Sequence, residues 1–587
     1  MRRFSAAILV LGLIGAAALG GCSRDSRQEA ADARLKAIYE SEWKWRTDQQ
    51  PNDEDGTRPI ADHLPRVDAA TQEIRLKYWE DVLARVDAVP RASLSAREQI
   101  NYDVYRAQII VLIANQRFRD FEMPANSDTT FWTDLSSTAH RSFRTLADYE
   151  HWLAQLQQIP RYFREEMDEM RAGLKRGFTP PRITMAGRDR SITAVTEAAT
   201  PEDSLLYVPF KDMPGIPEAK RASLRAAAAK TIGEVVQPAY RELLGFMRSE
   251  YLPGLRNTIS AADLPDGRNY YRAKIREFTT LELDPEAIHQ LGVTEVARIR
   301  EAMVAAMQET GFKGDFATFL NFLRSDPRFY ARTSEELLMR AAWIAKRFDG
   351  KASQFFGYLP RARFAIKPVS DDLAPFYTAG RGGAGVYLLN TYDLPSRPLY
   401  NLTALTLHEA APGHAFQIPI AMEHKDQPAF RQLTYVSAYG EGWALYCERL
   451  GLEMGLYDSA YDRFGMLGYQ IWRAARLVVD TGIHAQGWTR EQAMDYFRQN
   501  TALPEHEIGT EIDRYIAWPG QALSYYLGER AILEGRAHAE QVLGEHFNIR
   551  AFHDAVLELG SVPLPVLTAR IERFIAEGGR GPYPEME

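Results

Sequence analysis

The chain has 587 residues, with a hydrophobic fraction of 45%, a charged fraction of 25% and a formal net charge of −8. These fractions are typical of a soluble globular protein, and the length favours either several domains or one large helical fold. Basic and acidic residues are mixed along the chain without a basic block. This distribution argues against a nucleic-acid-binding protein.

The N-terminus has the composition of an export signal. The stretch MRRFSAAILVLGLIGAAALGGC combines two arginines, an apolar run and small residues that end at Cys22, which predicts a signal peptide over residues 1–21. LGGC resembles a bacterial lipobox, in which cleavage leaves the cysteine as a lipidated N-terminus. A plain secretory signal and an uncleaved anchor are the alternatives. Ser23 in the next position favours the outer membrane of a Gram-negative cell, so we expect a lipoprotein that faces the periplasm, with residues 22–33 as its tether.

Disulfide bonds are not expected to stabilise this protein. The chain contains two cysteines, Cys22 and Cys447. If Cys22 carries lipid, Cys447 has no partner, and the protein depends on its hydrophobic core.

Helical signals dominate the mature chain. Helix starts are predicted at three places where a capping residue precedes apolar residues at helical spacing. Ser95 with Glu98 and Thr489 with Gln492 have the pattern of a capping box, and Asp284 is followed by Pro285 in the first helical position. Strand-like alternation is scarce, and the best candidate is GVYLLNTYDL, which follows TAGRGGAG. We therefore predict a mostly α fold with a small β-sheet.

The organisation along the chain follows from proline- and glycine-bearing stretches. Candidate boundaries lie near residues 201–217 and 360–385. We predict a helical domain over residues 34–587, with an N-terminal half that ends near residue 357 and a second half from about residue 358.

The stretch LHEAAPGHAFQ carries a His-Glu pair, and the next histidine follows six residues after the first. In a regular helix, His408 and His414 would differ by about 120° in direction and about 9 Å in height, so they could not share one metal ion. Pro412 lacks the N–H that would bond to the helix, and Gly413 tolerates unusual backbone conformations. We therefore expect the helix to distort here and bring the two rings together. A capped helix end followed by a loop histidine is the alternative.

A second acidic element follows in YVSAYGEGWALYCERLGLEMGLYD. Glu441 and Glu448 lie seven residues apart on one face of a predicted helix. Two carboxylates on an apolar face are costly to bury without partners. At about 10.5 Å along the axis they cannot both bind one ion, so we expect one to be a ligand and the other to orient a histidine. Two solvated acids are the alternative.

Three blocks together resemble the bacterial domain-of-unknown-function family 885: GVYLLNTYDLPSRPLYNLTALTLHEAAPGHAFQ, VSAYGEGWALYCERLG and EIDRYIAWPGQALSYYLG. The resemblance covers most of the mature chain. That family looks like a distant relative of the helical zinc peptidases of the thimet-oligopeptidase and thermostable-carboxypeptidase types. The resemblance implies a large helical peptidase-like fold, a Zn²⁺ cofactor and a peptide substrate. Carried over, the metal ligands are His408, His414 and Glu441, the general base is Glu409, and Glu448 orients a ligand.

Other residues are implied by the same resemblance. In those peptidases a tyrosine near the C-terminus stabilises the oxyanion, and WPGQALSYYLG looks similar, which implies Tyr525, with Tyr526 as its alternative. A core tyrosine is the other interpretation. Arg514 is a candidate for binding substrate. His484 is expected in the core, and His424 is a further candidate ligand.

The glycine-rich stretch GRGGAGVYLLNT lies just before the motif. In many zinc peptidases an edge strand at this place pairs with the extended substrate, so we predict substrate contacts at Gly383, Tyr387 and Asn390. A glycine-rich turn without a ligand is the alternative. The stretch is not a dinucleotide-binding fingerprint, because no strand-helix unit accompanies it.

The sequence thus predicts a zinc-dependent peptidase of the cell envelope. Two other functions remain open: a metal-free binding lipoprotein that keeps the peptidase fold, and a zinc amidohydrolase that acts on cell-wall material. The sequence does not distinguish internal from terminal cleavage.

Overall fold

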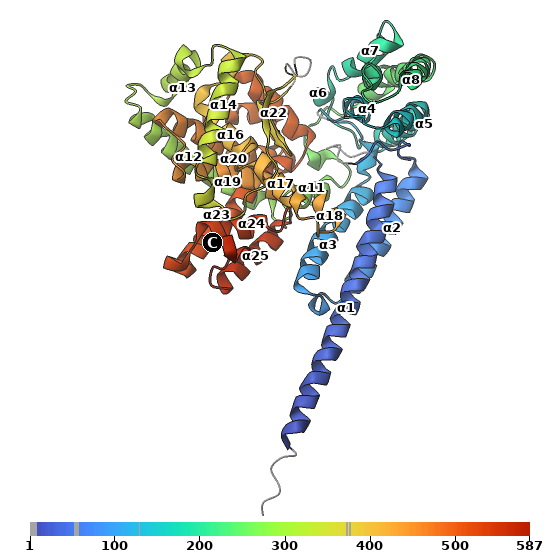
Figure 1. Cartoon of the computed structure of the whole chain (residues 1–587). Coiled ribbons are helices and arrows are strands. Elements are labelled where there is room, and N and C mark those ends of the chain that lie inside the picture. Colours follow the sequence, from blue (N-terminus) through green and yellow to red (C-terminus); the bar gives the residue numbers. More distant parts are fainter. Residues whose placement is uncertain (1–8, 52–57, 128, 371–373, 375–376, 587) are drawn as a thin grey trace, which may run out of the picture.

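The computed structural model describes residues 9–51, 58–127, 129–370, 374 and 377–586. The chain is mostly helical with one small sheet, as predicted (Figure 1). The first helices are α1 (Leu9–Gln49), α2 (Ala69–Asp87), α3 (Ala96–Phe118), α4 (Phe131–Ala139), α5 (Leu146–Arg176), α6 (Arg182–Met185), α7 (Arg190–Thr196), α8 (Glu218–Thr231), α9 (Gln237–Phe246) and α10 (Leu252–Gly254). They are followed by α11 (Gly267–Thr279), α12 (Pro285–Glu309), α13 (Phe316–Ser325), α14 (Ser334–Asp349) and α15 (Ala352–Phe355).

After the sheet come α16 (Leu399–Glu409), α17 (His414–Glu423), α18 (Ala429–Gln432), α19 (Ser437–Glu453), α20 (Ala460–Gln486), α21 (Arg490–Asn500), α22 (Glu505–Ala517), α23 (Ser524–Leu543), α24 (Ile549–Leu557) and α25 (Leu564–Ala576). The sheet has three strands, β1 (Ala365–Pro368), β2 (Gly380–Gly383) and β3 (Val386–Leu389), in the order β1-β3-β2. β1 runs parallel and β2 antiparallel to the central β3. β2 packs against α16 and α17, which places the sheet next to the motif, as predicted.

Two hydrophobic cores hold the described residues together. The smaller core lies within residues 60–255 and joins α4–α10, which form a separate group in Figure 1. The larger core combines α1–α3 with the elements from α11 onward. The cores therefore do not follow the two predicted halves, and the stretch 201–217 contributes to the smaller core instead of lying between two units.

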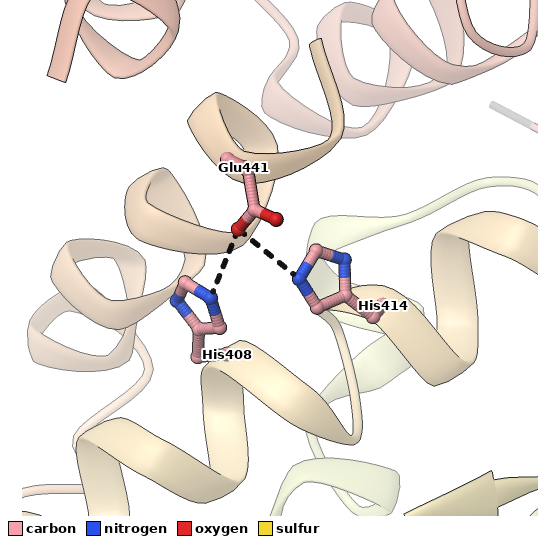
Figure 2. A group of neighbouring side chains, drawn as sticks. All are labelled: His408, His414 and Glu441. Carbon is pink, nitrogen blue, oxygen red and sulfur yellow. Dashed lines mark ion pairs between the residues drawn. The ribbon is translucent and has the colours of Figure 1, made fainter. Parts of the chain in front are cut away.

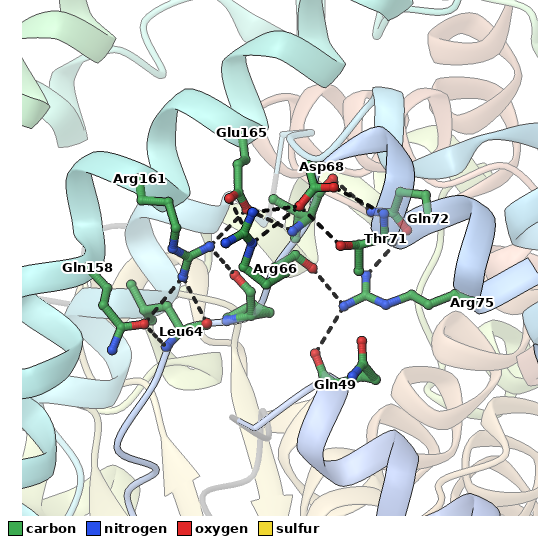
Figure 3. A network of polar contacts seen from close by, with 12 residues as sticks. Gln49, Leu64, Arg66, Asp68, Thr71, Gln72, Arg75, Gln158, Arg161 and Glu165 are labelled. Carbon is green, nitrogen blue, oxygen red and sulfur yellow. Dashed lines mark hydrogen bonds and ion pairs between the residues drawn. The ribbon is translucent and has the colours of Figure 1, made fainter.

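A polar network connects the loop before α2 to α5 (Figure 3). The Glu165 carboxylate on α5 lies 3.0 Å from Nε of Arg66 and accepts the backbone N–H of Val67 at 3.0 Å. Arg161 binds the same carboxylate at 2.8 Å and donates to the carbonyl oxygen of Leu64. The smaller core is thereby fixed to the N-terminal helices through directional bonds.

The predicted helix starts are present. Thr489 and Gln492 form a reciprocal capping box, and Asp284 caps α12 with a proline in its first turn. Ser95 caps α3 through its side chain, but its own N–H donates to Asp32 instead of to Glu98. Only half of that predicted capping box forms, because a carboxylate from α1 takes the second donor.

The predicted tether, residues 22–33, lies within α1, which runs unbroken from Leu9 to Gln49. Residues 1–8 of the predicted signal peptide and the side chain of Cys22 lie outside the described part of the structure. Among the helices that the structure describes, none combines the length and apolar character needed to cross a membrane.

Candidate metal centre

The motif helix ends between the two histidines. α16 stops at Glu409, the chain turns through residues 410–413, and α17 begins at His414. Gly413 donates its N–H to the carbonyl oxygen of Leu407 at 3.0 Å, and a Cβ at Gly413 would lie only 1.8 Å from the carbonyl oxygen of His408. The distortion predicted at this position is thus a complete break of the helix. Only glycine fits at position 413, where the turn comes closest to the His408 carbonyl oxygen.

The break brings the two imidazole rings together. Their centroids lie 5.1 Å apart with an interplanar angle of 85°. Glu441, in the second turn of α19, points its carboxylate between them, as Figure 2 shows. Oε2 of Glu441 is 3.5 Å from Nε2 of His408 and 3.4 Å from Nε2 of His414. One nitrogen or oxygen from each residue lies within 4.8 Å of the others, so the three form a group that could hold a metal ion.

Glu448 lies behind the first histidine, in the contact expected of the orienting carboxylate. Nδ1 of His408 bonds to Oε1 of Glu448 at 2.8 Å, and the Glu448 side chain is completely buried. If Nδ1 carries the proton, the lone pair of Nε2 faces Glu441, where a metal would lie. Arg473 adds a positive charge, with Nη2 at 3.6 Å from the same Oε1. Trp443 donates to the carbonyl oxygen of Pro412 at 2.8 Å and so fixes the turn formed by residues 410–413.

Without a metal, the group behaves as a set of buried ion pairs. Burial alone would lower the pKa of His408, but its bonds to Glu441 and Glu448 outweigh this effect and raise the pKa to about 10. Burial opposes ionisation of Glu441 as well, yet the two histidines hold its pKa well below the usual range. This arrangement fits a cation, because a metal would replace protons that the carboxylates otherwise attract.

Glu409 is held by the sheet. Its Oε2 accepts the backbone N–H of Gly382 on β2 at 2.6 Å. A Cβ at Gly382 would lie 1.8 Å from the Glu409 carbonyl oxygen and 2.9 Å from Cβ of His414. Sequence reasoning chose the next residue, Gly383, where an added Cβ would meet nothing within 4 Å. The close approach that requires glycine is therefore at Gly382.

The structure does not bring the side chains of Tyr387 and Asn390 to the metal group. Both residues are fully buried. Tyr387 lies on β3, the central strand, and faces the core, whereas Asn390 donates to the carbonyl oxygens of Ala374 and Tyr377. The edge strand on the side of the motif is β2, and substrate contacts at Tyr387 and Asn390 stay a prediction.

The two candidate tyrosines on α23 point to different partners. The Tyr525 hydroxyl accepts a bond from Nη2 of Arg514 at 3.3 Å, and the Arg476 guanidinium lies 4.3 Å from the centroid of its ring. Tyr526 donates instead to Glu295 on α12 at 2.7 Å. The structure thus joins Tyr525 and Arg514, which were predicted separately, in one contact.

Sequence reasoning missed Tyr435, which directly contacts Glu441 of the candidate metal group. Its hydroxyl donates to Oε1 of Glu441 at 3.3 Å. Its ring lies over Gly440, where an added Cβ would be 2.3–2.4 Å from the ring and hydroxyl. Gly440, directly before Glu441, is the sequence signal that could have indicated this close contact.

The remaining histidines lie elsewhere. His484 is fully buried, bonded to the N–H of Ala261 and the carbonyl oxygen of Tyr515, which confirms the predicted core position. His424 stacks on Tyr358 and does not belong to the group of possible ligands found among the described residues.

The fold and the site define a mostly helical protein with a His-His-Glu group whose two histidines are buried. The chain belongs to the family described as "Bacterial protein of unknown function (DUF885)", whose model matches residues 52–571. This confirms the family that the sequence resembles.

Among solved structures, the chain is similar to a protein of Colwellia psychrerythraea provisionally described as a lipoprotein. They share 25% identity over 93% of this chain and 99% of that one, with a TM-score of 0.86. A provisionally described lipoprotein of unknown function from Shewanella oneidensis has 16% identity over 91% and 98% of the two chains, with a TM-score of 0.66, and shows the same fold. A protein of Bacillus anthracis str. Ames, provisionally described as oligoendopeptidase F, matches at 11% identity over 87% and 96%, with a TM-score of 0.27. No curated protein matches the chain.

Proposed function

We propose that this protein is a zinc-dependent peptidase of the cell envelope. The observation that carries the proposal is the convergence of Nε2 of His408, Nε2 of His414 and Oε2 of Glu441, with Glu409 directly beside the first ligand. Two imidazoles and one carboxylate form a common ligand set of catalytic zinc, which leaves a fourth position open. The Glu448 contact to His408 supports this assignment, because such partners orient zinc-bound histidines.

When bound, a zinc ion supplies Lewis-acid chemistry, polarising a carbonyl oxygen and lowering the pKa of a water molecule. The proposed role of Glu409 is to take a proton from the attacking water and pass it to the leaving amine. The bond from the Gly382 N–H fixes the carboxylate on the sheet side of the site. The extra residues of the motif lie after Glu409, so its position next to His408 does not depend on them.

Tyr525 is the proposed donor to the oxyanion. Its oxygen accepts a bond from Arg514, which leaves the phenolic hydrogen available for a second partner. In this proposal Arg514 orients Tyr525, in addition to its predicted contact with the substrate. Tyr435 is a second phenol near the metal ligands, and in the absence of substrate it is bonded to Glu441.

β2 offers an edge for an extended peptide. The bond from the N–H of Asn390 to the carbonyl oxygen of Ala379 fixes the register of the β2–β3 pair. In that register the backbone groups of Gly380 and Gly382 point away from β3. We propose that a peptide substrate lies along this edge, next to the candidate ligands, and pairs with the outward backbone groups of Gly380 and the carbonyl of Gly382. The Gly382 N–H is bonded to Glu409, and the Gly383 backbone faces β3 in this register.

Anchoring through Cys22 is the second part of the proposal. It rests on the LGGC sequence and on the similarity to the Colwellia protein described provisionally as a lipoprotein. We place the protein on the outer membrane, facing the periplasm. A Cys22→Ser variant should lose the lipid-dependent mass increase and leave the membrane fraction. A variant that stays there with unchanged mass would contradict lipidation.

The test of catalysis combines metal analysis with turnover. We expect one zinc per chain in protein purified without added metal, and a loss of zinc in His408→Ala and His414→Ala. Glu409→Gln should keep zinc and lose about a hundredfold or more in peptide turnover, the scale of general-base catalysis. Zinc-free wild-type protein would favour a metal-free binding lipoprotein. A zinc protein that cleaves wall fragments but no member of a peptide library would favour the amidohydrolase.

A further inference from the structure

The two faces of strand β2 have different surroundings. A Cβ at Gly380 would lie 3.7 Å from Cγ of Glu409, and one at Gly382 would lie 1.8 Å from the Glu409 carbonyl oxygen, so both glycines face the motif helices. Successive side chains of a strand point to opposite faces, and Arg381 therefore points away from α16. Arg381 is exposed. The outer face of β2 thus carries a positive charge between two residues that lie against the proposed base.

Arg381 belongs to a row of side chains that crosses the sheet. It is paired with Leu388 on β3, which is paired in turn with Lys367 on β1. Paired residues of neighbouring strands project from the same face, so these three side chains share the outer face of the sheet. Lys367 is exposed as well. A peptide added at the edge of β2 would extend this row by one side chain, next to Arg381.

The hydrogen bonds of β2 determine the kind of pair that forms opposite Arg381. The carbonyl oxygen of Ala379 accepts from the N–H of Asn390, so the backbone of Arg381 faces β3 and that of Gly380 faces outward. An antiparallel peptide therefore bonds to Gly380, and its residue opposite Arg381 forms a non-hydrogen-bonded pair. Side chains are closest in such pairs, where the Cα atoms are about 4.5 Å apart. Opposite charges there stabilise the pairing, and like charges oppose it.

We propose that the enzyme prefers acidic peptides, with an aspartate or glutamate at the position opposite Arg381. This preference rests on the proposed peptidase function and names its substrate class. The substrate carboxylate accepts from the Arg381 guanidinium on the outer face of the sheet, while the substrate backbone bonds to Gly380. Arg381 need not be free of other partners, because a guanidinium has five N–H donors and exposed ion pairs exchange at little cost.

The test is cleavage of matched peptides that carry Glu, Gln or Lys at one position, scanned along the peptide, in about 0.1 M salt. At a single position, we expect wild type to have a kcat/KM about two- to fivefold higher for Glu than for Gln, the scale of a cross-strand charge pair, and lowest for Lys. Arg381→Gln should remove this preference, and Arg381→Glu should reverse it in favour of Lys. About 1 M salt should weaken it.

Lys367→Glu is the matched control, because it reverses a charge in the same row at an exposed position. Lys367 lies three strand spacings from the peptide, or about 14 Å, which exceeds the screening length of about 10 Å at this salt concentration. The variant should therefore keep the wild-type preference. If Lys367→Glu and Arg381→Glu change the preference equally, the charge opposite Arg381 is not its cause.

Binding of the same peptides to Glu409→Gln, with and without Arg381→Glu, separates the preference from catalysis. If wild type cleaves no peptide, but Glu409→Gln binds Glu peptides more tightly and Arg381→Glu reverses this, the peptidase function fails and the acidic preference stands. If wild type cleaves Glu and Lys peptides equally at every position, the peptidase function stands and the preference is overturned. It is also overturned if folded Arg381→Glu keeps the preference for Glu, or if no peptide is either cleaved or bound.

Discussion

The contact between His408 and Glu448 gives the sharpest test of the metal centre. Glu448→Gln keeps the size of the side chain but removes the charge that faces Nδ1 of His408 at 2.8 Å. Neither side chain is more than 3% exposed, so water cannot replace the lost partner. Removing such a partner lowers metal affinity about 10- to 100-fold, or about 1.4–2.7 kcal/mol. The variant also leaves the buried Arg473 without this carboxylate, which adds a cost in folding stability.

The assay is competition for zinc against a chelator of known affinity at fixed pH. Glu453→Gln is the matched control, because Glu453 lies on the same helix but is 48% exposed and pairs with Arg536. We expect its zinc affinity to stay within about twofold of wild type, as for most exposed substitutions. If folded Glu448→Gln binds zinc as tightly as wild type, the orienting role is refuted. If wild type binds no zinc, the metal centre itself is refuted.

Three further predictions follow from the same structure. Gly382→Ala should displace Glu409 and lower peptide turnover at least about tenfold, because the added methyl group would overpack this contact at a cost of about 1–3 kcal/mol. Gly383→Ala is the control and should leave turnover unchanged. Equal turnover in the two variants would contradict the close approach at Gly382. Tyr435→Phe should weaken zinc binding about tenfold in chelator competition without lowering the unfolding temperature of the metal-free protein; unchanged affinity would remove Tyr435 from the site. Burial lowers the pKa of His484 to about 3, below its unfolded value of 6.5, so the stability it contributes is present above pH 6.5 and is lost as the pH falls toward 3. A folded His484→Gln variant should show a shallower loss of unfolding free energy over that range in denaturant titrations, and an unchanged slope would count against the assignment.

Local signals predicted the helices well, because a cap depends on residues three positions apart. Thr489 with Gln492 and Asp284 with its proline both appear as expected. The failure at Ser95 has a clear cause: the competing acceptor, Asp32, is 63 residues away in the chain. Division into cores was harder to predict for the same reason, since α1–α3, which end at Phe118, join elements that begin only at Gly267.

At the site, residue type, spacing and the family resemblance were sufficient to select the three residues that converge, but not the groups around them. Two histidines and two glutamates stand out in apolar surroundings, and a helix fixes the distance between Glu441 and Glu448. Nothing in the spacing shows that Tyr435 folds back over Gly440, or that a strand glycine reaches Glu409. These contacts form through space, between elements whose relative placement the sequence pattern does not give.

The spacing of the motif shows why the inserted residues need not prevent metal binding. In an unbroken helix, the residue that returns to the face of His408 is four positions later. Here the helix ends at Glu409, so His414 is placed by the start of a second helix, and its distance from His408 is no longer set by helical periodicity. The turn is fixed by the bond from Gly413 to Leu407 and by Trp443, which holds the Pro412 carbonyl from α19. Because α19 also supplies Glu441, the same helix that completes the candidate group stabilises the break on which the group depends.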